Sequence, residues 1–225
     1  MIGVTIASPR YATMAQTAVN SFRESTGCDA VVIHTANEGN YDRKLNLHRL
    51  FSGQKQSVIY FDSDTLWVGK TDLSKFEDRE AFLAVHDPCL SADYGPEEEF
   101  PVRDCKAHGL DPMAYFNSGV FIFNHRHEAV FEKAKWAFKN LKFSDFGEQS
   151  ALNYGVQNTP AVLELLGEEW NFFPFAHRRL DKVNWPVNLR VIHAAGYPPH
   201  LKQRALQAFE QQLFEQHVLR LPRLS

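Results

Sequence analysis

Apolar residues in the N-terminal part of the chain form short runs that are separated by segments with helical spacing. The runs at Ile2–Ala7, Ala30–His34 and Val58–Asp62 are rich in β-branched and aromatic residues and predict strands. Between them, Thr13–Glu24 and Tyr41–Phe51 place their apolar residues on one helical face and predict helices. Strands that alternate with helices in this way are typical of α/β proteins with a parallel sheet.

The alternation continues through the rest of the chain after one interruption. The expected elements are strands at Ala81–Val85, Tyr115–Asn124, Ala161–Leu166 and Leu189–Ala194, and helices at Glu128–Leu141 and Gly147–Gly155. The interruption, His86–Met113, has four prolines, the acidic run Glu97–Glu99 and little periodicity, so we expect a long loop. A loop of this length within a compact domain usually serves a function.

A helix is also predicted near the C-terminus, at residues 201–218. Its apolar residues fall on one side: Leu206, Phe209, Leu213 and Val218. Three placements fit this pattern: docking on the body of the protein, which is the commonest, pairing two subunits as a homodimer, or touching a membrane. Because the chain has no internal repeat and no low-complexity linker, we expect residues 1–225 to form a single domain.

The composition excludes several classes of protein. With 225 residues, 44% hydrophobic and 23% charged, the chain is typical of a globular protein and not of a disordered one. The net charge is −3 and the basic residues are scattered, so nucleic acid is not an expected partner. The cysteines Cys28, Cys89 and Cys105 lack zinc spacing and predict free thiols in a reducing compartment. We expect no leader peptide, no transmembrane segment and a cytoplasmic protein.

The strand predicted at Val58–Asp62 carries the most informative chemistry. It is a buried apolar run that ends in two carboxylates one residue apart, Asp62 and Asp64. Open α/β folds bind ligands at the carboxyl edge of the sheet, where this run ends. Carboxylates this close repel each other unless a cation lies between them, which indicates a divalent metal site. Acidic residues that end a strand also serve as helix caps or turn formers without any metal.

Several short motifs occur in a defined order along the chain. These are Thr5-Ile-Ala-Ser-Pro-Arg-Tyr11, Lys44-Leu45, Asp62-Ser-Asp64-Thr65-Leu66, Asp87, Phe116-Asn117-Ser118-Gly119-Val120, Gly147-Glu148-Gln149-Ser-Ala-Leu-Asn153 and Val191-Ile-His193-Ala-Ala-Gly196. Together they resemble the family 8 glycosyltransferases, the group that includes glycogenin and bacterial lipopolysaccharide galactosyltransferases. The resemblance extends from Ile2 to about Lys202, and each motif is weak alone.

This resemblance implies a GT-A fold, with a mostly parallel central sheet, flanking helices and a site for a nucleotide sugar. It implies a transferase that moves a hexose from a UDP-sugar, such as UDP-glucose or UDP-galactose, to an acceptor. The anomeric configuration is expected to be retained. The sequence identifies neither the acceptor nor the donor sugar.

The resemblance also implies roles for particular residues. Asp62, Asp64 and His193 are expected to bind Mn²⁺ or Mg²⁺. Mn²⁺ is favoured because imidazole is a poor ligand for Mg²⁺, the harder of the two ions. The expected donor-binding residues are Ala7, Ser8, Tyr11, Lys44, Ser63, Asn117, Ser118, Gly196 and Lys202. The expected catalytic residues are Glu148, Gln149 and Asp87.

Two departures from the family pattern affect these expectations. The family continues its His-x-x-Gly motif with x-x-Lys-Pro-Trp, and Pro199 occupies the place of that phosphate-binding lysine. The candidates for the missing cation are Lys202, Arg178 and Arg179, with Lys182 nearby in the sequence. Glu148 replaces the aspartate of many members, which lengthens the carboxylate by one methylene group.

Three other functions fit parts of the pattern. A sugar-nucleotide hydrolase needs the same donor site without an acceptor. A non-catalytic nucleotide-sugar-binding protein is compatible with the lysine missing after Gly196. A haloacid-dehalogenase-like phosphatase also has a strand that ends in Asp-x-Asp, but its motif requires threonine at the fifth position, where this chain has Leu66.

Overall fold

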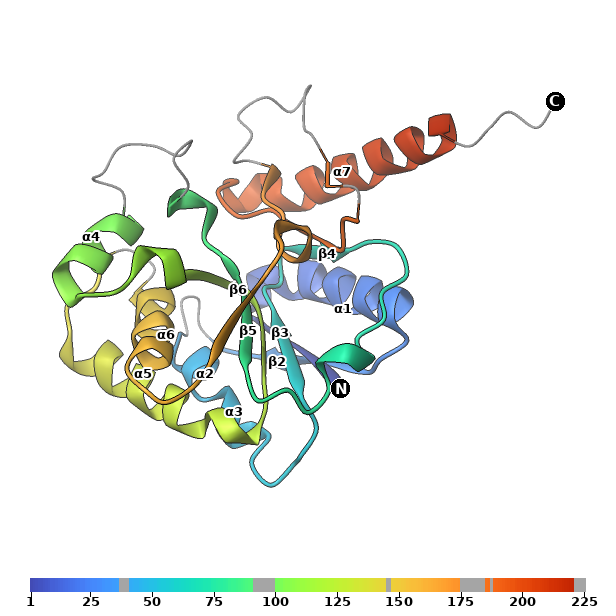
Figure 1. Ribbon diagram of the computed structural model, residues 1–225. Coiled ribbons are helices and arrows are strands. Elements are labelled where there is room, and N and C mark those ends of the chain that lie inside the picture. The colour runs from blue at the N-terminus through green and yellow to red at the C-terminus, as the bar shows by residue number, and fades with distance from the viewer. Residues whose placement is uncertain (37–40, 91–99, 145–146, 175–184, 187, 221–225) are drawn as a thin grey trace.

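The computed structural model describes residues 1–36, 41–90, 100–144, 147–174, 185–186 and 188–220, and its centre is a six-stranded sheet (Figure 1). In spatial order the strands are β2 (Ala30–His34), β1 (Ile2–Ala7), β3 (Val58–Phe61), β6 (Phe116–Phe123), β5 (Phe82–His86) and β7 (Leu163–Leu166). β1 pairs in parallel with β2 and β3, and β5 pairs in parallel with β7. Only β6 is antiparallel to its neighbours, so the sheet is mostly parallel, as predicted.

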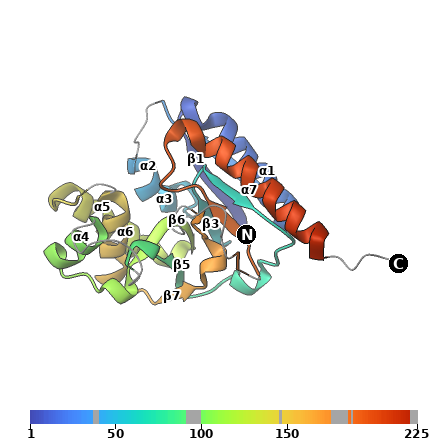
Figure 2. The ribbon, with the colours of Figure 1, turned by 90° about the horizontal axis from the view of Figure 1, so that it is seen from above.

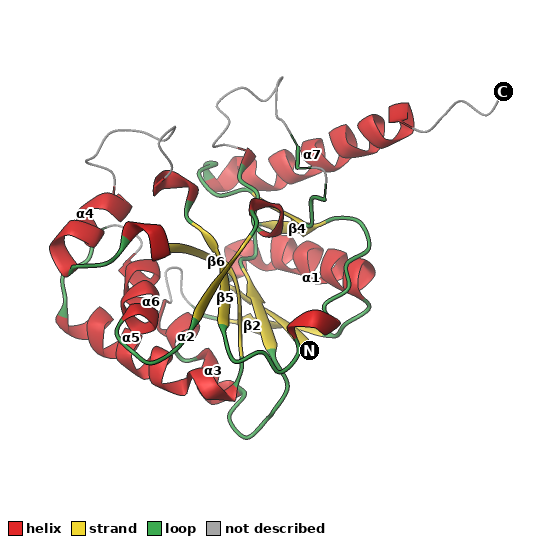
Figure 3. Ribbon diagram, viewed as in Figure 1, coloured by secondary structure: helices red, strands yellow, loops and turns green. Residues whose placement is uncertain are grey.

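Helices lie on both sides of the sheet (Figures 1, 2 and 3). They are α1 (Ala12–Thr26), α2 (Tyr41–Leu45), α3 (Leu47–Leu50), α4 (Phe100–His108), α5 (Glu128–Asn140), α6 (Gly147–Gln157) and α7 (Pro199–Arg220). Figure 2 shows α1 and α7 on one side of the strands and α4, α5 and α6 on the other. This layered arrangement leaves the carboxyl ends of β1 and β3 at one edge of the sheet, because the two strands are parallel neighbours.

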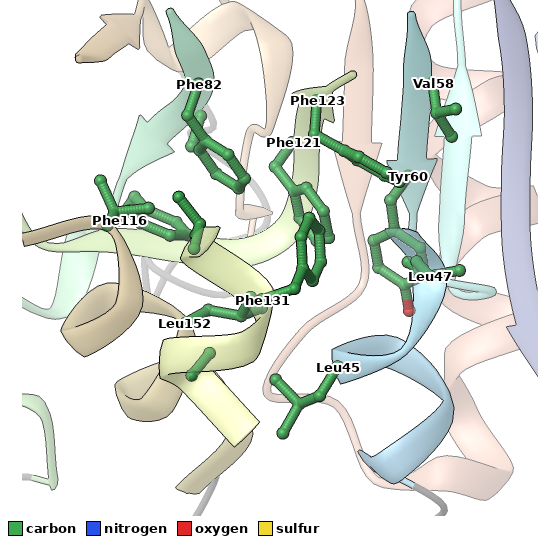
Figure 4. Close-up of a cluster of buried hydrophobic side chains, with 14 of the residues drawn as sticks. Leu45, Leu47, Val58, Tyr60, Phe82, Phe116, Phe121, Phe123, Phe131 and Leu152 are labelled. Atoms are coloured by element: carbon green, nitrogen blue, oxygen red, sulfur yellow. The ribbon is translucent and has the colours of Figure 1, made fainter. Parts of the chain in front are cut away.

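An aromatic core fills the space between the sheet and helices α2, α3, α5 and α6 (Figure 4). Tyr60, Phe121 and Phe82 stack across three adjacent strands, with ring centroids 4.9 Å and 5.4 Å apart. Phe131 of α5 and Leu152 of α6 are fully buried against these rings. Burial of large rings is the main source of favourable free energy here, and it accounts for part of the high phenylalanine content of the chain.

A second, two-stranded sheet places His193. β4 (Thr65–Trp67) and β8 (Val191–His193) pair antiparallel, with Thr65 opposite His193. The pattern of apolar residues predicts the strand of His193 but not β4. The histidine lies opposite the residue that follows Asp64, because β4 begins directly after the acidic turn.

The prediction of a long loop at His86–Met113 is partly wrong, because Phe100–His108 forms helix α4. Two buried positions of this helix are occupied by Pro101 and Asp104. These residues interrupt the apolar spacing by which a helix is predicted from sequence. Asp104 is only 2% exposed and is stabilised in this position by a hydrogen bond from Ser150. Residues 91–99, which include the acidic run, lie outside the described residues.

The single helix expected at Tyr41–Phe51 is interrupted at Asn46, so that α2 and α3 are separate. The backbone of Asn46 leaves the helical region (φ −108°, ψ 7°), and its side-chain amide donates to the Asp42 carbonyl at 2.5 Å. Asparagine often competes with helix geometry through such local hydrogen bonds.

Helix α7 docks on the body of the protein through its first half. Leu206 and Phe209 are buried against Met14 of α1 and Leu66 of β4, and Leu213 packs beside them. The side chain of Val218 lies outside the described residues, and the single-domain organisation stays a prediction. None of the described helices has the length and apolar character needed to cross a membrane.

Candidate functional site

The turn after β3 carries both aspartates and is fixed by backbone hydrogen bonds. The Asp62 amide donates to the Gly119 carbonyl on β6 at 2.8 Å. The Thr65 hydroxyl donates to the Asp62 carbonyl at 2.8 Å, which tightens the turn. The Ala194 amide donates to the Asp64 carbonyl at 2.9 Å, which attaches the turn to the end of β8.

The side chains of Asp62, Asp64 and His193 converge at this turn. One ligand atom from each lies within 4.8 Å of the others. His193 Nε2 is 3.3 Å from Asp64 Oδ1 and 3.7 Å from Asp62 Oδ2. The other Asp62 oxygen, Oδ1, accepts hydrogen bonds from the Tyr60 hydroxyl at 2.5 Å and from Lys44 Nζ at 3.2 Å. Two carboxylate oxygens and one imidazole nitrogen therefore face a common point, a ligand set that fits a divalent cation.

Lys202, in the first turn of α7, donates a hydrogen bond to Asp64 Oδ2. Burial raises the pKa of Asp64, but His193 and Lys202 outweigh burial and hold this pKa well below its usual range. Burial lowers the pKa of Lys202, and the carboxylate of Asp64 more than offsets it, so that the pKa is raised. The site therefore holds an ionised aspartate and a protonated lysine at neutral pH. The other cation candidates, Arg178, Arg179 and Lys182, lie outside the described residues.

Lys44 connects the aspartate turn to the first turn of α6. Besides Asp62, its ammonium contacts Ser118 Oγ at 3.0 Å and Glu148 Oε1 at 3.7 Å. Glu148 is 6% exposed, and burial raises its pKa although the charge of Lys44 opposes this shift. The second oxygen of Glu148, Oε2, has no hydrogen-bond partner among the described residues. A buried carboxylate oxygen without a donor is costly, and such groups are common at functional sites.

Asp87 and Gln149, which were expected to be catalytic, and Asn117, which was expected to bind the donor, form one buried cluster. Gln149 Nε2 donates to Asp87 Oδ2 at 2.7 Å, and Asn117 Nδ2 donates to the same oxygen at 3.2 Å. Asn117 Nδ2 also donates to Gln149 Oε1 at 2.9 Å. The structure thus brings together three residues that lie far apart in the sequence.

The residues expected to contact the nucleotide lie at the same edge. Ala7 ends β1, and the hydroxyl of Ser8 is buried with no hydrogen-bond partner among the described residues. Tyr11 is half-buried and packs against the apolar cluster under α7. Ser63 is half-buried between the two aspartates, and Gly196 has a positive φ of 83° where the chain turns toward α7.

Two residues of this site were missed in the sequence. Tyr60 donates to a predicted metal ligand, and its position two residues before Asp62, at the spacing of side chains on one face of a strand, was the available signal. Asn171 contacts His193 Nδ1 at 2.9 Å, and a lone asparagine between Trp170 and Phe172 gave no comparable signal.

Comparisons with known proteins identify the fold. No protein-family model matches the sequence, and a search of curated proteins finds no significant match. Among solved structures, the bifunctional glycosyltransferase WbbM matches with a TM-score of 0.64 and 18% identity over 88% of this chain, which spans 46% of WbbM. The galactosyltransferase LgtC, solved with donor and acceptor sugar analogues, matches with a TM-score of 0.61 and 17% identity, covering 92% of this chain and 96% of LgtC.

A third match is a glycosyltransferase that takes part in glycosylation of the major capsid of PBCV-1, with a TM-score of 0.60 and 11% identity, covering 92% of this chain and 98% of that one. The chain therefore has the GT-A glycosyltransferase fold that its motifs predicted. At identities this low, the matches establish the fold and leave the reaction to be argued from the site.

Proposed function

We propose that this protein is a metal-dependent glycosyltransferase that moves a hexose from a UDP-sugar to an acceptor with retention of configuration. Asp62, Asp64 and His193 are assigned to Mn²⁺, with Mg²⁺ as the alternative ion. The observation that carries the proposal is the convergence of these three ligand atoms within 4.8 Å at the sheet edge of a GT-A fold. UDP-glucose and UDP-galactose are the donors to test first.

In the proposed reaction the bond between the anomeric carbon and the diphosphate breaks, and the diphosphate keeps the electron pair. The acceptor oxygen bonds to the same carbon and gives up its proton. A bound cation neutralises the charge that develops on the diphosphate. Lys202 supports the same task, because its ammonium lies against Asp64 although the family lysine is missing at Pro199. Its charge is available to a phosphate oxygen at the cation site.

The sugar half of the site is assigned to Asp87, Gln149 and Glu148. The amide and carboxylate groups of Asp87 and Gln149 match the donors and acceptors of sugar hydroxyls, which is the kind of contact that sets sugar choice. Glu148 Oε2, which has no hydrogen-bond partner among the described residues, is assigned to a sugar hydroxyl or to the positive charge that develops at the anomeric carbon. The nucleotide is assigned to the turn after β1, where the Ser8 hydroxyl has no partner in the part of the chain that the structure describes and where Tyr11 presents a ring.

A product assay tests the proposal and separates it from its alternatives. Purified protein is incubated with Mn²⁺ and a UDP-hexose, with and without a panel of sugar acceptors, and UDP and free hexose are measured. A transferase releases UDP faster with its acceptor, a hydrolase releases UDP and hexose equally without one, and a binding protein releases neither. The GT-A fold gives no support to the phosphatase alternative.

The matched variants for this assay are Asp64→Asn and Asp72→Asn. The first removes a proposed ligand charge and is expected to lower turnover about 100-fold or more. The second removes an exposed carboxylate that accepts a hydrogen bond from the Ser74 amide, and turnover should stay within about twofold of wild type. Equal turnover of Asp64→Asn and wild type would exclude the assignment.

A further inference from the structure

Asn171 links the proposed cation site to the sugar-site amides. It is 3% exposed, its Oδ1 lies 2.9 Å from His193 Nδ1, and its Nδ2 donates to Asn117 Oδ1 at 2.9 Å. We propose that Asn171 is a positioning residue that accepts a hydrogen bond from Nδ1 of His193 and so directs Nε2 of the ring toward Asp62 and Asp64. The inference rests on the proposed function only where it assigns His193 to a cation.

The orientation of the two asparagine amides follows from a backbone donor. The Gly119 amide donates to the side-chain oxygen of Asn117 at 2.8 Å. A backbone N–H is only a donor, so the oxygen of Asn117 must face it. Asn171 must then present its NH₂ group to that oxygen, which leaves its own oxygen toward His193. An oxygen at this position requires a proton on Nδ1 of the imidazole.

The second backbone donor of β6 fixes the other end of the chain of amides. The Ser118 amide donates to Gln149 Oε1 at 3.0 Å, so the oxygen of Gln149 faces it. Asn117 Nδ2 donates to the same oxygen at 2.9 Å. The orientation of Asn117 is therefore set from both sides, and the polar chain runs without a break from Gln149 through Asn117 and Asn171 to His193.

The consequence for His193 is a prearranged ligand. A neutral imidazole carries one proton, and a proton held on Nδ1 leaves the Nε2 lone pair free for a cation. Hydrogen bonds to the outer nitrogen of a metal-bound histidine fix its orientation and raise its basicity. The edge of Phe173, whose ring centroid is 4.8 Å from that of His193, further restricts rotation of the imidazole.

Asn171→Leu, Asn171→Ala and Asn171→Asp test this inference with two readouts. The first is whether Nδ1 of His193 carries a proton in the cation-free protein, measured by ¹⁵N NMR. The second is the affinity for Mn²⁺, measured by calorimetry. Asn124→Leu is the matched control, because Asn124 is also 3% exposed and donates to the Arg79 carbonyl at 2.7 Å, but lies at the opposite end of β6.

We expect Asn171→Leu to lose the preference for the Nδ1 proton and to weaken Mn²⁺ binding about 10- to 100-fold. Asn171→Ala should have the same two effects, and it replaces Asn171→Leu in the test if the leucine variant does not fold. Asn171→Asp keeps an oxygen for the Nδ1 proton but loses the NH₂ group that donates to Asn117 Oδ1, so it should weaken the preference for the Nδ1 proton less than Asn171→Leu does. Asn124→Leu should lower thermal stability and change neither readout.

Retention of the Nδ1 proton and of Mn²⁺ affinity within about twofold in Asn171→Leu or Asn171→Ala would overturn the inference. If the wild-type protein binds no Mn²⁺, the cation assignment fails separately, and the ¹⁵N NMR measurement still decides the role of Asn171.

Discussion

Gly119 gives His193 the space that it occupies. A Cβ atom at position 119 would overlap the imidazole, lying 2.6 Å from His193 Nδ1, and would lie 2.8 Å from Asn117 Oδ1. Real side chains do not approach this closely, so any larger residue at 119 must displace the histidine. The glycine of the Phe-Asn-Ser-Gly-Val motif is therefore explained by the position of a proposed cation ligand contributed by β8.

Gly119→Ala is expected to displace His193 and weaken Mn²⁺ binding by about tenfold or more. Calorimetry with Mn²⁺ measures this. The control is Gly3→Ala, whose Cβ would lie 2.6 Å from the Phe22 ring in the core on the α1 side of the sheet. Both variants should lose stability through overpacking, and only Gly119→Ala should lose Mn²⁺ affinity. Equal affinities of the two would contradict the explanation.

Lys202→Met is expected to weaken UDP binding in the presence of Mn²⁺ by about tenfold or more, because it removes a charged donor from the proposed diphosphate site. Titration of UDP into the Mn²⁺-loaded protein measures the change. Arg204→Met, which removes an exposed cation from the same helix, is the control and should leave the affinity near wild type. If both variants bind UDP as tightly as wild type, Lys202 does not replace the missing lysine.

Glu148→Gln is expected to change stability in a pH-dependent way. The raised pKa of Glu148 means that the folded protein binds more protons than the unfolded chain above the ordinary value of 4.5. This term lowers the free energy of unfolding as the pH rises from about 4.5 through the folded pKa. Glutamine does not titrate, so the melting temperature of the variant should rise relative to that of wild type as the pH rises. The kcat of the variant should be lower than that of wild type by about tenfold or more.

Glu128→Gln is the matched control for Glu148, because Glu128 occupies the first turn of α5 but is exposed. Its melting temperature relative to wild type should not vary with pH in the same way. A constant difference in melting temperature between Glu148→Gln and wild type across pH 4 to 8 would contradict the prediction, because the pKa of Glu148 would then not be raised in the folded protein.

Tyr11→Ala is expected to weaken UDP binding about two- to tenfold, because stacking on the uracil ring contributes roughly 0.5–1.5 kcal/mol beyond burial. Tyr11→Phe retains the ring and should bind UDP within about twofold of wild type. Calorimetry of both variants decides the point. An alanine variant with unchanged affinity would remove Tyr11 from the nucleotide site.

The sequence was sufficient for the elements whose residues are uniform in character. Ile2–Ala7 and Ala30–His34 have the predicted bounds, because apolar runs between polar turns leave little choice of register. The acidic turn and the residues of the buried cluster, Asp87, Asn117 and Gln149, were selected as site residues because their motifs occur in the order of the family pattern.

Other features depend on contacts that no local pattern records. α4 turns Asp104 inward because Ser144 and Ser150 satisfy its carboxylate. β4 is a short strand that forms only with β8, more than 100 residues later in the chain. The role of Asn171 depends on its contacts with His193 and Asn117, which only the fold brings beside it.

The central claim is a cation site that serves a nucleotide sugar, and calorimetric titration of UDP with and without Mn²⁺ tests it most directly. The account predicts that Mn²⁺ tightens UDP binding about tenfold or more in wild type and that Asp64→Asn abolishes this gain. Equal UDP affinity of the wild-type protein with Mn²⁺ and with a chelator, or an undiminished Mn²⁺ effect in Asp64→Asn, would contradict it.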